Sequence, residues 1–106
     1  MSQVKLYIAG PMTGLPNYNL PAFHAAAANL RGKGHDVVNP AELPAPEEPT
    51  WENYLRGALR AMLTCEAVVL LPGWMQSNGA RLERMVADRL RMPVYDYAHF
   101  EITEEK

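Results

Sequence analysis

Apolar and polar residues follow one another along the chain in blocks that predict strands alternating with helices. Two apolar runs, 4–9 (VKLYIA) and 67–71 (AVVLL), are typical of strands buried in a parallel sheet. Shorter runs at 36–39 (DVVN) and 93–97 (PVYDY) predict two further strands. Glycine and proline follow several of these runs, which indicates turns at their ends.

Three helices are predicted between the strands. Segment 22–31 is rich in alanine, and segment 51–63 repeats apolar residues at the i, i+3, i+4, i+7 spacing of one helix face, with Thr50 as its cap. Segment 79–91 forms the third helix. Because strands that alternate with helices pair in parallel, the pattern predicts an α/β fold, a small three-layer sandwich with four or five mostly parallel strands.

Ligands of such sheets bind beyond the carboxyl ends of the strands. The loops expected at that edge are 10–19, 39–50 and 72–78. Ser77 can cap the helix that follows, and Gly79 lets a ligand approach the backbone closely, so the free amides there predict an anion site.

Glu83 is the polar residue that the helical phase places on the apolar side of its helix. At 100° per residue it falls with Val86, Ala87 and Leu90, whereas the arginines occupy the remaining surface. An unpaired buried carboxylate is costly or has a raised pKa. Two interpretations stay open: a structural carboxylate bonded to helix-start amides or an arginine, or a functional group that points into the site.

Tyr7 is the second polar feature, in the middle of the first strand. It is either an ordinary sheet residue or a residue whose buried hydroxyl needs a partner. A carboxylate in the site would be one such partner.

Composition narrows the class of protein. The 106 residues fit one domain, 1–106, and 48% of them are hydrophobic, enough for a packed core. A net charge of −2 argues against binding to a nucleic-acid polymer, and Cys65 is the only cysteine, so no intrachain disulfide forms. No apolar run reaches the ~20 residues that cross a bilayer. We expect a soluble, cytoplasmic protein with no membrane contact and no metal site.

Several motifs together resemble a known family. They are the first strand and turn 7–12 (YIAGPM), Asn39-Pro40, and the run at 70–87, which contains Gly73-Trp74 and the spacing S-x-G-A-x-x-E. These residues look like the nucleoside 2-deoxyribosyltransferase superfamily, and most like its small uncharacterised phage and bacterial branch. The likeness covers roughly residues 4–96.

The resemblance implies a flavodoxin-like, Rossmann-like fold and a set of roles. The family's nucleophilic glutamate falls on Glu83, and the tyrosine that positions it falls on Tyr7. In the branch that hydrolyses deoxynucleoside monophosphates, the serine at the 5′ side falls on Ser77. Members are homo-oligomers whose sites often borrow residues from a neighbouring subunit.

Motifs and loops together predict a substrate-binding set around the two catalytic residues. Trp74 either stacks on the base or covers the core, and Glu42 is the best placed of three candidate proton donors, the others being Asp36 and Glu66. The predicted substrate-binding residues are Gly10, Pro11, Met12, Asn39, Glu42, Gly73, Trp74, Ser77, Gly79 and Ala80.

The predicted function is cleavage or transfer of the N-glycosidic bond of a (deoxy)nucleoside or its 5′-monophosphate through a glutamate nucleophile. Hydrolysis is favoured over transfer, because nothing in the sequence marks a site for an acceptor base, and no cofactor is needed. Glu66 and Asn78 stand where the family often has an aspartate and an acidic residue. These departures motivate the alternative, a non-catalytic nucleotide-binding protein that sequesters a nucleotide or nucleotide-derived signal.

Overall fold

A computed structural model describes residues 4–100 of the chain. Its described part contains one sheet of four strands, β1 (Lys5–Ala9), β2 (Asp36–Val38), β3 (Ala67–Leu70) and β4 (Val94–Asp96). The strands lie in the order β2-β1-β3-β4, and all three pairings are parallel. The predicted α/β fold with a small parallel sheet is confirmed.

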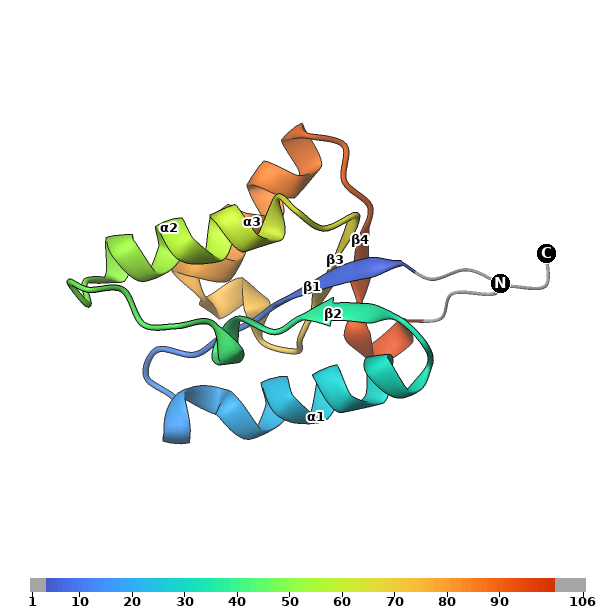
Figure 1. Ribbon diagram of the computed structural model, residues 1–106, viewed down its shortest axis with the longest axis horizontal. Helices are drawn as coiled ribbons and strands as arrows, with labels where there is room; N and C mark the ends of the chain where they lie inside the picture. Colours follow the sequence, from blue (N-terminus) through green and yellow to red (C-terminus); the bar gives the residue numbers. More distant parts are fainter. Residues whose placement is uncertain (1–3, 101–106) are drawn as a thin grey trace.

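Three helices cover the two faces of this sheet. As Figure 1 shows, α1 (Leu20–Gly32) lies on one face, whereas α2 (Trp51–Met62) and α3 (Asn78–Arg89) lie on the other. The result is the three-layer sandwich that the sequence predicts. Element boundaries differ from the predicted ones by one or two residues, the usual uncertainty at fraying ends.

Alternation along β1 divides the core into two layers, because successive side chains of a strand point to opposite faces. Leu6 and Ile8 are completely buried and pack in one cluster with Phe23 and other residues of α1. Tyr7 and Ala9 point the other way, into a cluster that holds residues from α2 and α3. β1 therefore places Tyr7 beneath α2 and α3.

The starts of α2 and α3 are fixed by side-chain caps. The Oγ1 of Thr50 accepts a hydrogen bond from the Asn53 amide at 3.1 Å, and the Oγ of Ser77 accepts one from the Ala80 amide at 3.1 Å. Both predicted caps are confirmed. The residue before α1, Asn19, has a left-handed backbone and makes no side-chain cap.

The apolar stripe of α2 is covered less than its sequence pattern suggests. Of the helix residues only Met62 is buried, whereas Trp51 and Tyr54 are 50% and 51% exposed. The stripe borders a pocket along much of its length, so its aromatic side chains line open space. Within residues 4–100, no helix is long and apolar enough to cross a bilayer.

Candidate active site

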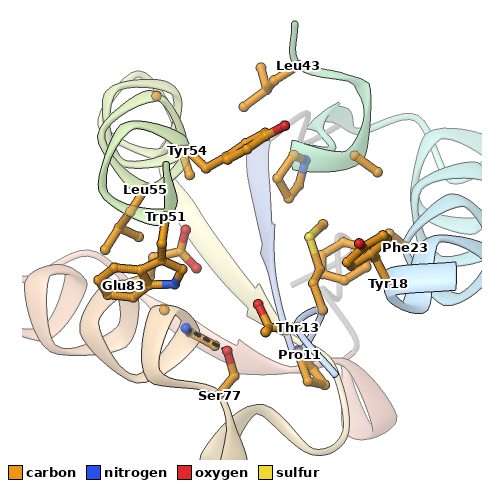
Figure 2. A pocket seen from close by; sticks show the side chains of 18 of the residues that line it. Pro11, Thr13, Tyr18, Phe23, Leu43, Trp51, Tyr54, Leu55, Ser77 and Glu83 are labelled. Atoms are coloured by element: carbon orange, nitrogen blue, oxygen red, sulfur yellow. Dashed lines mark hydrogen bonds between the residues drawn. The ribbon is translucent and has the colours of Figure 1, made fainter. Parts of the chain in front are cut away.

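A pocket of about 1370 Å³ opens at the carboxyl edge of the sheet. Its walls are the end of β1 and the loop after it, the proline-rich loop that precedes α2, α2 itself, and the start of α3. Figure 2 shows side chains from all of these elements pointing into it. This is the edge at which ligands of open parallel sheets bind.

Tyr7 and Glu83 meet at the base of this pocket. The hydroxyl of Tyr7 donates a hydrogen bond to Oε2 of Glu83 at 2.6 Å. Tyr7 is 1% exposed and Glu83 is 6% exposed, yet both line the pocket. The helical phase of the sequence therefore located Glu83 correctly, and its partner is the tyrosine of the central strand.

Burial dominates the electrostatics of this pair. It raises the pKa of Glu83 to about 7, although the hydrogen bond from Tyr7 opposes the shift. Burial also raises the pKa of Tyr7 well above its usual value, and the Glu83 carboxylate adds to this shift. Tyr7 is thus a permanent donor, while Glu83 exchanges its proton near neutral pH.

The N-terminus of α3 forms the neighbouring wall. Ser77, Gly79 and Ala80 all line the pocket, close in sequence to Glu83. Helix starts carry free amides and the positive end of the helix dipole, so they attract anions. A Cβ on Gly79 would come no nearer than 3.9 Å to Leu55, so the chain itself leaves space there for a ligand.

The turn after β1 forms another wall of the pocket. Gly10, Pro11 and Met12 line it, and their contact with substrate stays a prediction. A Cβ at Gly10 would lie 2.8 Å from the Cβ of Leu71, which is closer than side-chain carbons approach. Glycine is therefore required here by packing between the two central strand ends.

Asn39 and Glu42 do not line the pocket. Asn39 is 2% exposed, and its Oδ1 accepts from the Ala41 amide at 3.0 Å, which shapes the turn after β2. Glu42 instead pairs with Arg31 at 2.8 Å on the surface, and this hydrogen bond lowers the pKa of the Glu42 carboxyl. Both side chains are therefore engaged by contacts within the chain, away from the pocket.

Gly73 and Trp74 also lie outside the pocket lining. Gly73 has a φ of +87°, a left-handed turn that favours glycine. Trp74 packs against the core under α3, and the Arg84 guanidinium lies 5.1 Å from its ring centroid. Of the two interpretations of Trp74, its position fits the cover over the core.

The two other candidate proton donors lie at the opposite edge of the sheet. Oε1 of Glu66 accepts from the Lys5 amide at 2.9 Å, at the beginning of β1 and β3. Asp36 begins β2 and is aligned with Lys5 in the sheet. Neither carboxyl lines the pocket that holds Glu83.

Side chains of α2 complete the walls, and among them the sequence did not single out Trp51 and Tyr54 as site residues. Trp51 and Tyr54 project from α2 into the pocket (Figure 2), and Arg60 lines it from the same helix. In the sequence, Trp51 and Tyr54 are aromatic residues on an amphipathic helix directly after a proline-rich loop. This spacing did not identify them as pocket residues, because helices that pack on a core show the same spacing. In the part of the chain described, His, Cys, Asp and Glu side chains form no cluster suited to a metal ion.

Comparison with solved structures finds the same fold in a 2-deoxyribosyltransferase from the psychrotolerant bacterium Bacillus psychrosaccharolyticus. The TM-score is 0.67 and the identity 22%, over 93% of this chain and 77% of that one. No curated protein sequence matches the chain. A family model described as a domain of unknown function, DUF4406, matches residues 4–96. With a match over nearly its whole length, the chain belongs to the DUF4406 family and has the Rossmann-like fold of a 2-deoxyribosyltransferase.

Proposed function

We propose that this protein hydrolyses the N-glycosidic bond of a (deoxy)nucleoside or its 5′-monophosphate, with Glu83 as nucleophile. The observation that carries the proposal is the 2.6 Å bond from Tyr7 to a carboxylate that is buried yet borders a large pocket. A purely structural carboxylate would gain nothing from facing that pocket.

The geometry suits attack at a sugar carbon. Glycosidic bonds break through an oxocarbenium-like state, which a carboxylate stabilises and can trap as a covalent ester. One oxygen of Glu83 accepts the bond from Tyr7, which leaves the second oxygen to attack. Tyr7 acts as a positioning residue, because its hydroxyl fixes the carboxylate that attacks.

The start of α3 is the proposed site for the 5′ side of the substrate. The Ser77 hydroxyl accepts from the Ala80 amide and retains its own proton for donation to a ligand. Together with the free amides of the first turn it makes a small anion site beside Glu83. A 5′-phosphate bound there would direct the anomeric carbon toward the carboxylate.

We also propose that the working form is a homo-oligomer. Large apolar side chains are exposed on α3 and directly after the ends of α2 and α3, among them Met85 (50%), Leu63 (53%) and Leu90 (56%). Contact with a second copy would remove this apolar surface from water. Light scattering during size-exclusion chromatography measures the mass that distinguishes a single chain from an assembly.

The direct test is release of free base. Purified protein is incubated with a panel of nucleosides and 5′-monophosphates, and the base is followed by chromatography. Glu83→Gln keeps the size of the side chain and an acceptor for Tyr7, so a loss of about a thousandfold or more in that variant would identify the nucleophile. A rate within a few-fold of the original protein would remove Glu83 from that role.

The alternative is a binding protein that holds a nucleotide without cleaving it. Its supporting observation is Asn78, which lines the pocket at a position where the family that the chain resembles often has an acidic residue. Tight retention of a nucleotide with no base release across pH 6–9 would establish this alternative.

A further inference from the structure

Gly57 lies in the interior of α2, as the seventh of its twelve residues. Glycine in a helix interior destabilises the helix relative to alanine, so its presence there needs a reason. Packing does not supply one, because a Cβ added at Gly57 would meet nothing within 4 Å among residues 4–100, apart from the adjoining helix backbone. The backbone does not supply one either, because Gly57 continues an ordinary α-helix.

Gly57 divides α2 into two halves with different surroundings. The half after it packs on the core layer under α2 and α3 through Ala58, Leu59, Ala61 and Met62, of which Met62 is completely buried. In the half before it, none of residues 51–56 is buried, and Trp51 and Tyr54 are half-exposed. The second half is therefore anchored to the fold, whereas the first half is not.

The first half of α2 is bonded to the loop before it. The Oγ1 of Thr50 accepts from the Asn53 amide at 3.1 Å, and the side-chain amide of Asn53 donates to the Glu48 carbonyl at 3.0 Å. Toward α3, Leu55 lies beside Gly79, which has no side chain to interlock with it. Residues 48–56 therefore form one unit with local hydrogen bonds, joined to the anchored half of the helix at Gly57.

The apolar side chains of the 48–56 unit line the pocket that holds Glu83. Trp51, Tyr54 and Leu55 point into the cavity (Figure 2). Hinges are positions that absorb a change in backbone angles, and glycine absorbs such a change at low cost. A swing of the unit about Gly57 would move the three side chains toward a bound ligand or away from it.

We propose that Gly57 is a hinge and that residues 48–56 close over a nucleotide bound at Glu83. This inference rests on the proposed function for the identity of the occupant. In the closed form, Trp51 and Tyr54 cover the nucleotide and exclude bulk water, which strengthens the electrostatic interactions inside the site. In the open form, the nucleotide enters and the products leave. Gly57 is thus a positioning residue that acts through the two aromatic side chains.

Distances between pairs of spin labels measure the swing directly. The single cysteine is first removed by Cys65→Ser. One protein then carries Glu52→Cys with Ala22→Cys, and a control carries Thr64→Cys with Ala22→Cys. These are exposed positions at the start of α2, on α1 and after the end of α2. Labelled chains are mixed with an excess of unlabelled protein, so that only distances within one chain are recorded in the intact assembly.

The Glu52 pair should give a broader distribution of distances than the Thr64 pair in the free protein. The 5′-monophosphates of 2′-deoxyuridine and 2′-deoxyadenosine are then added to the Glu83→Gln form, which prevents turnover. At least one of them should shift the Glu52 pair to shorter distances and leave the Thr64 pair unchanged. Equally sharp distributions for both pairs, or a Glu52 distribution that neither nucleotide shifts, would overturn the inference. A sharp Glu52 distribution in the assembly would make the aromatic residues of α2 a fixed surface.

Gly57→Ala supplies a second measurement, with Gly32→Ala as its matched control. Gly32 ends α1, has open space around it and lies outside the pocket lining. Alanine is favoured over glycine in helices, so both variants should keep or gain thermal stability, by up to about 8 °C. Only Gly57→Ala should narrow the Glu52 distance distribution and lower kcat several-fold, because lid motion limits many turnover rates.

The remaining outcomes separate the hinge from the proposed function. A Gly57→Ala protein whose KM rises while its label distances stay unchanged would overturn the hinge, because residue 57 would then only give room to the ligand. Base release by a protein with a rigid α2 would leave the proposed function standing. No base release from any compound would overturn the proposed function, and a Glu52 pair as sharp as the Thr64 pair in the free protein would still overturn the hinge.

Discussion

The Tyr7 hydroxyl donates to the Glu83 carboxylate across a distance of 2.6 Å, and this bond joins the central strand to the second turn of α3. The two residues are 76 positions apart in the chain. A short bond between two nearly buried groups fixes the carboxylate in one orientation at the edge of an open pocket. The pair is therefore held both by packing and by its hydrogen bond.

Tyr7→Phe should leave the fold in place and weaken the nucleophile. The hydrogen bond from Tyr7 lowers the pKa of Glu83, so its removal should raise that pKa further and free the carboxylate to rotate. We expect kcat to fall by up to about a hundredfold, the cost of a misplaced reacting group. The pH profile of base release is the decisive readout, because its acidic limb should move to higher pH. An unchanged profile would show that Tyr7 serves only packing.

Activity of the original protein should increase with pH through neutrality. Glu83 must be ionised to attack, and burial raises its pKa to about 7. The acidic limb of kcat/KM against pH reports that pKa in the free protein. Measurement of base release from pH 5 to 9 should give a midpoint near 7, and a midpoint near the ordinary glutamate value of 4.5 would mean that the carboxylate is solvated.

Stability should change with pH in the opposite direction. The folded pKa of Glu83 lies above the unfolded one, so its proton stabilises the fold below pH 4.5, and this contribution is lost as pH rises to about 7. The shift corresponds to roughly 3 kcal/mol of unfolding free energy. Urea denaturation between pH 4.5 and 8 should show this decline in the original protein, and Glu83→Gln should remove it. An equal decline in both proteins would assign the effect to other groups.

Periodicity was sufficient to predict the sheet, the helices and the burial of Glu83. Strand alternation and helical phase depend only on residue spacing, so they can be predicted without knowledge of the tertiary structure. The caps at Thr50 and Ser77 were equally predictable, because each lies directly before its helix. These features place the proposed nucleophile at the carboxyl edge.

Side-chain direction in the loops was not predictable in this way. Glu42 follows β2 at the carboxyl edge of the sheet, but its carboxylate pairs with Arg31 of α1 on the surface and not with the pocket. Trp74 follows a left-handed glycine that turns the chain, and it packs under Arg84. Conversely, Trp51 was hidden in a helical stripe that resembles a core face. Each outcome depends on contacts between segments far apart in the chain, which spacing does not encode.

The fluorescence of the two tryptophans of the chain can show where a ligand binds. Trp51 is half-exposed and lines the pocket, whereas Trp74 does not line it. Base stacking on an indole quenches its fluorescence, so Trp74→Phe should retain the quenching on nucleotide addition and Trp51→Phe should lose it. We also expect Trp51→Phe to weaken binding, because base–aromatic stacking contributes about 1–3 kcal/mol. Quenching that persists in Trp51→Phe and vanishes in Trp74→Phe would reverse the assignment.

Ser77 and Thr50 make a matched pair that separates a cap from a substrate contact. Each hydroxyl oxygen accepts one backbone amide at 3.1 Å, at the start of α3 and α2 respectively. Ser77→Ala and Thr50→Ala should therefore each lower the unfolding free energy by about 1 kcal/mol. Only Ser77→Ala should change the ratio of kcat/KM for a 5′-monophosphate to that for its nucleoside, because only Ser77 lines the pocket beside Glu83. A fall in that ratio confined to Ser77→Ala would place the phosphate at the start of α3. If both variants lose stability and neither changes the ratio, Ser77 is a helix cap alone, and the 5′ side of the substrate lies elsewhere in the pocket.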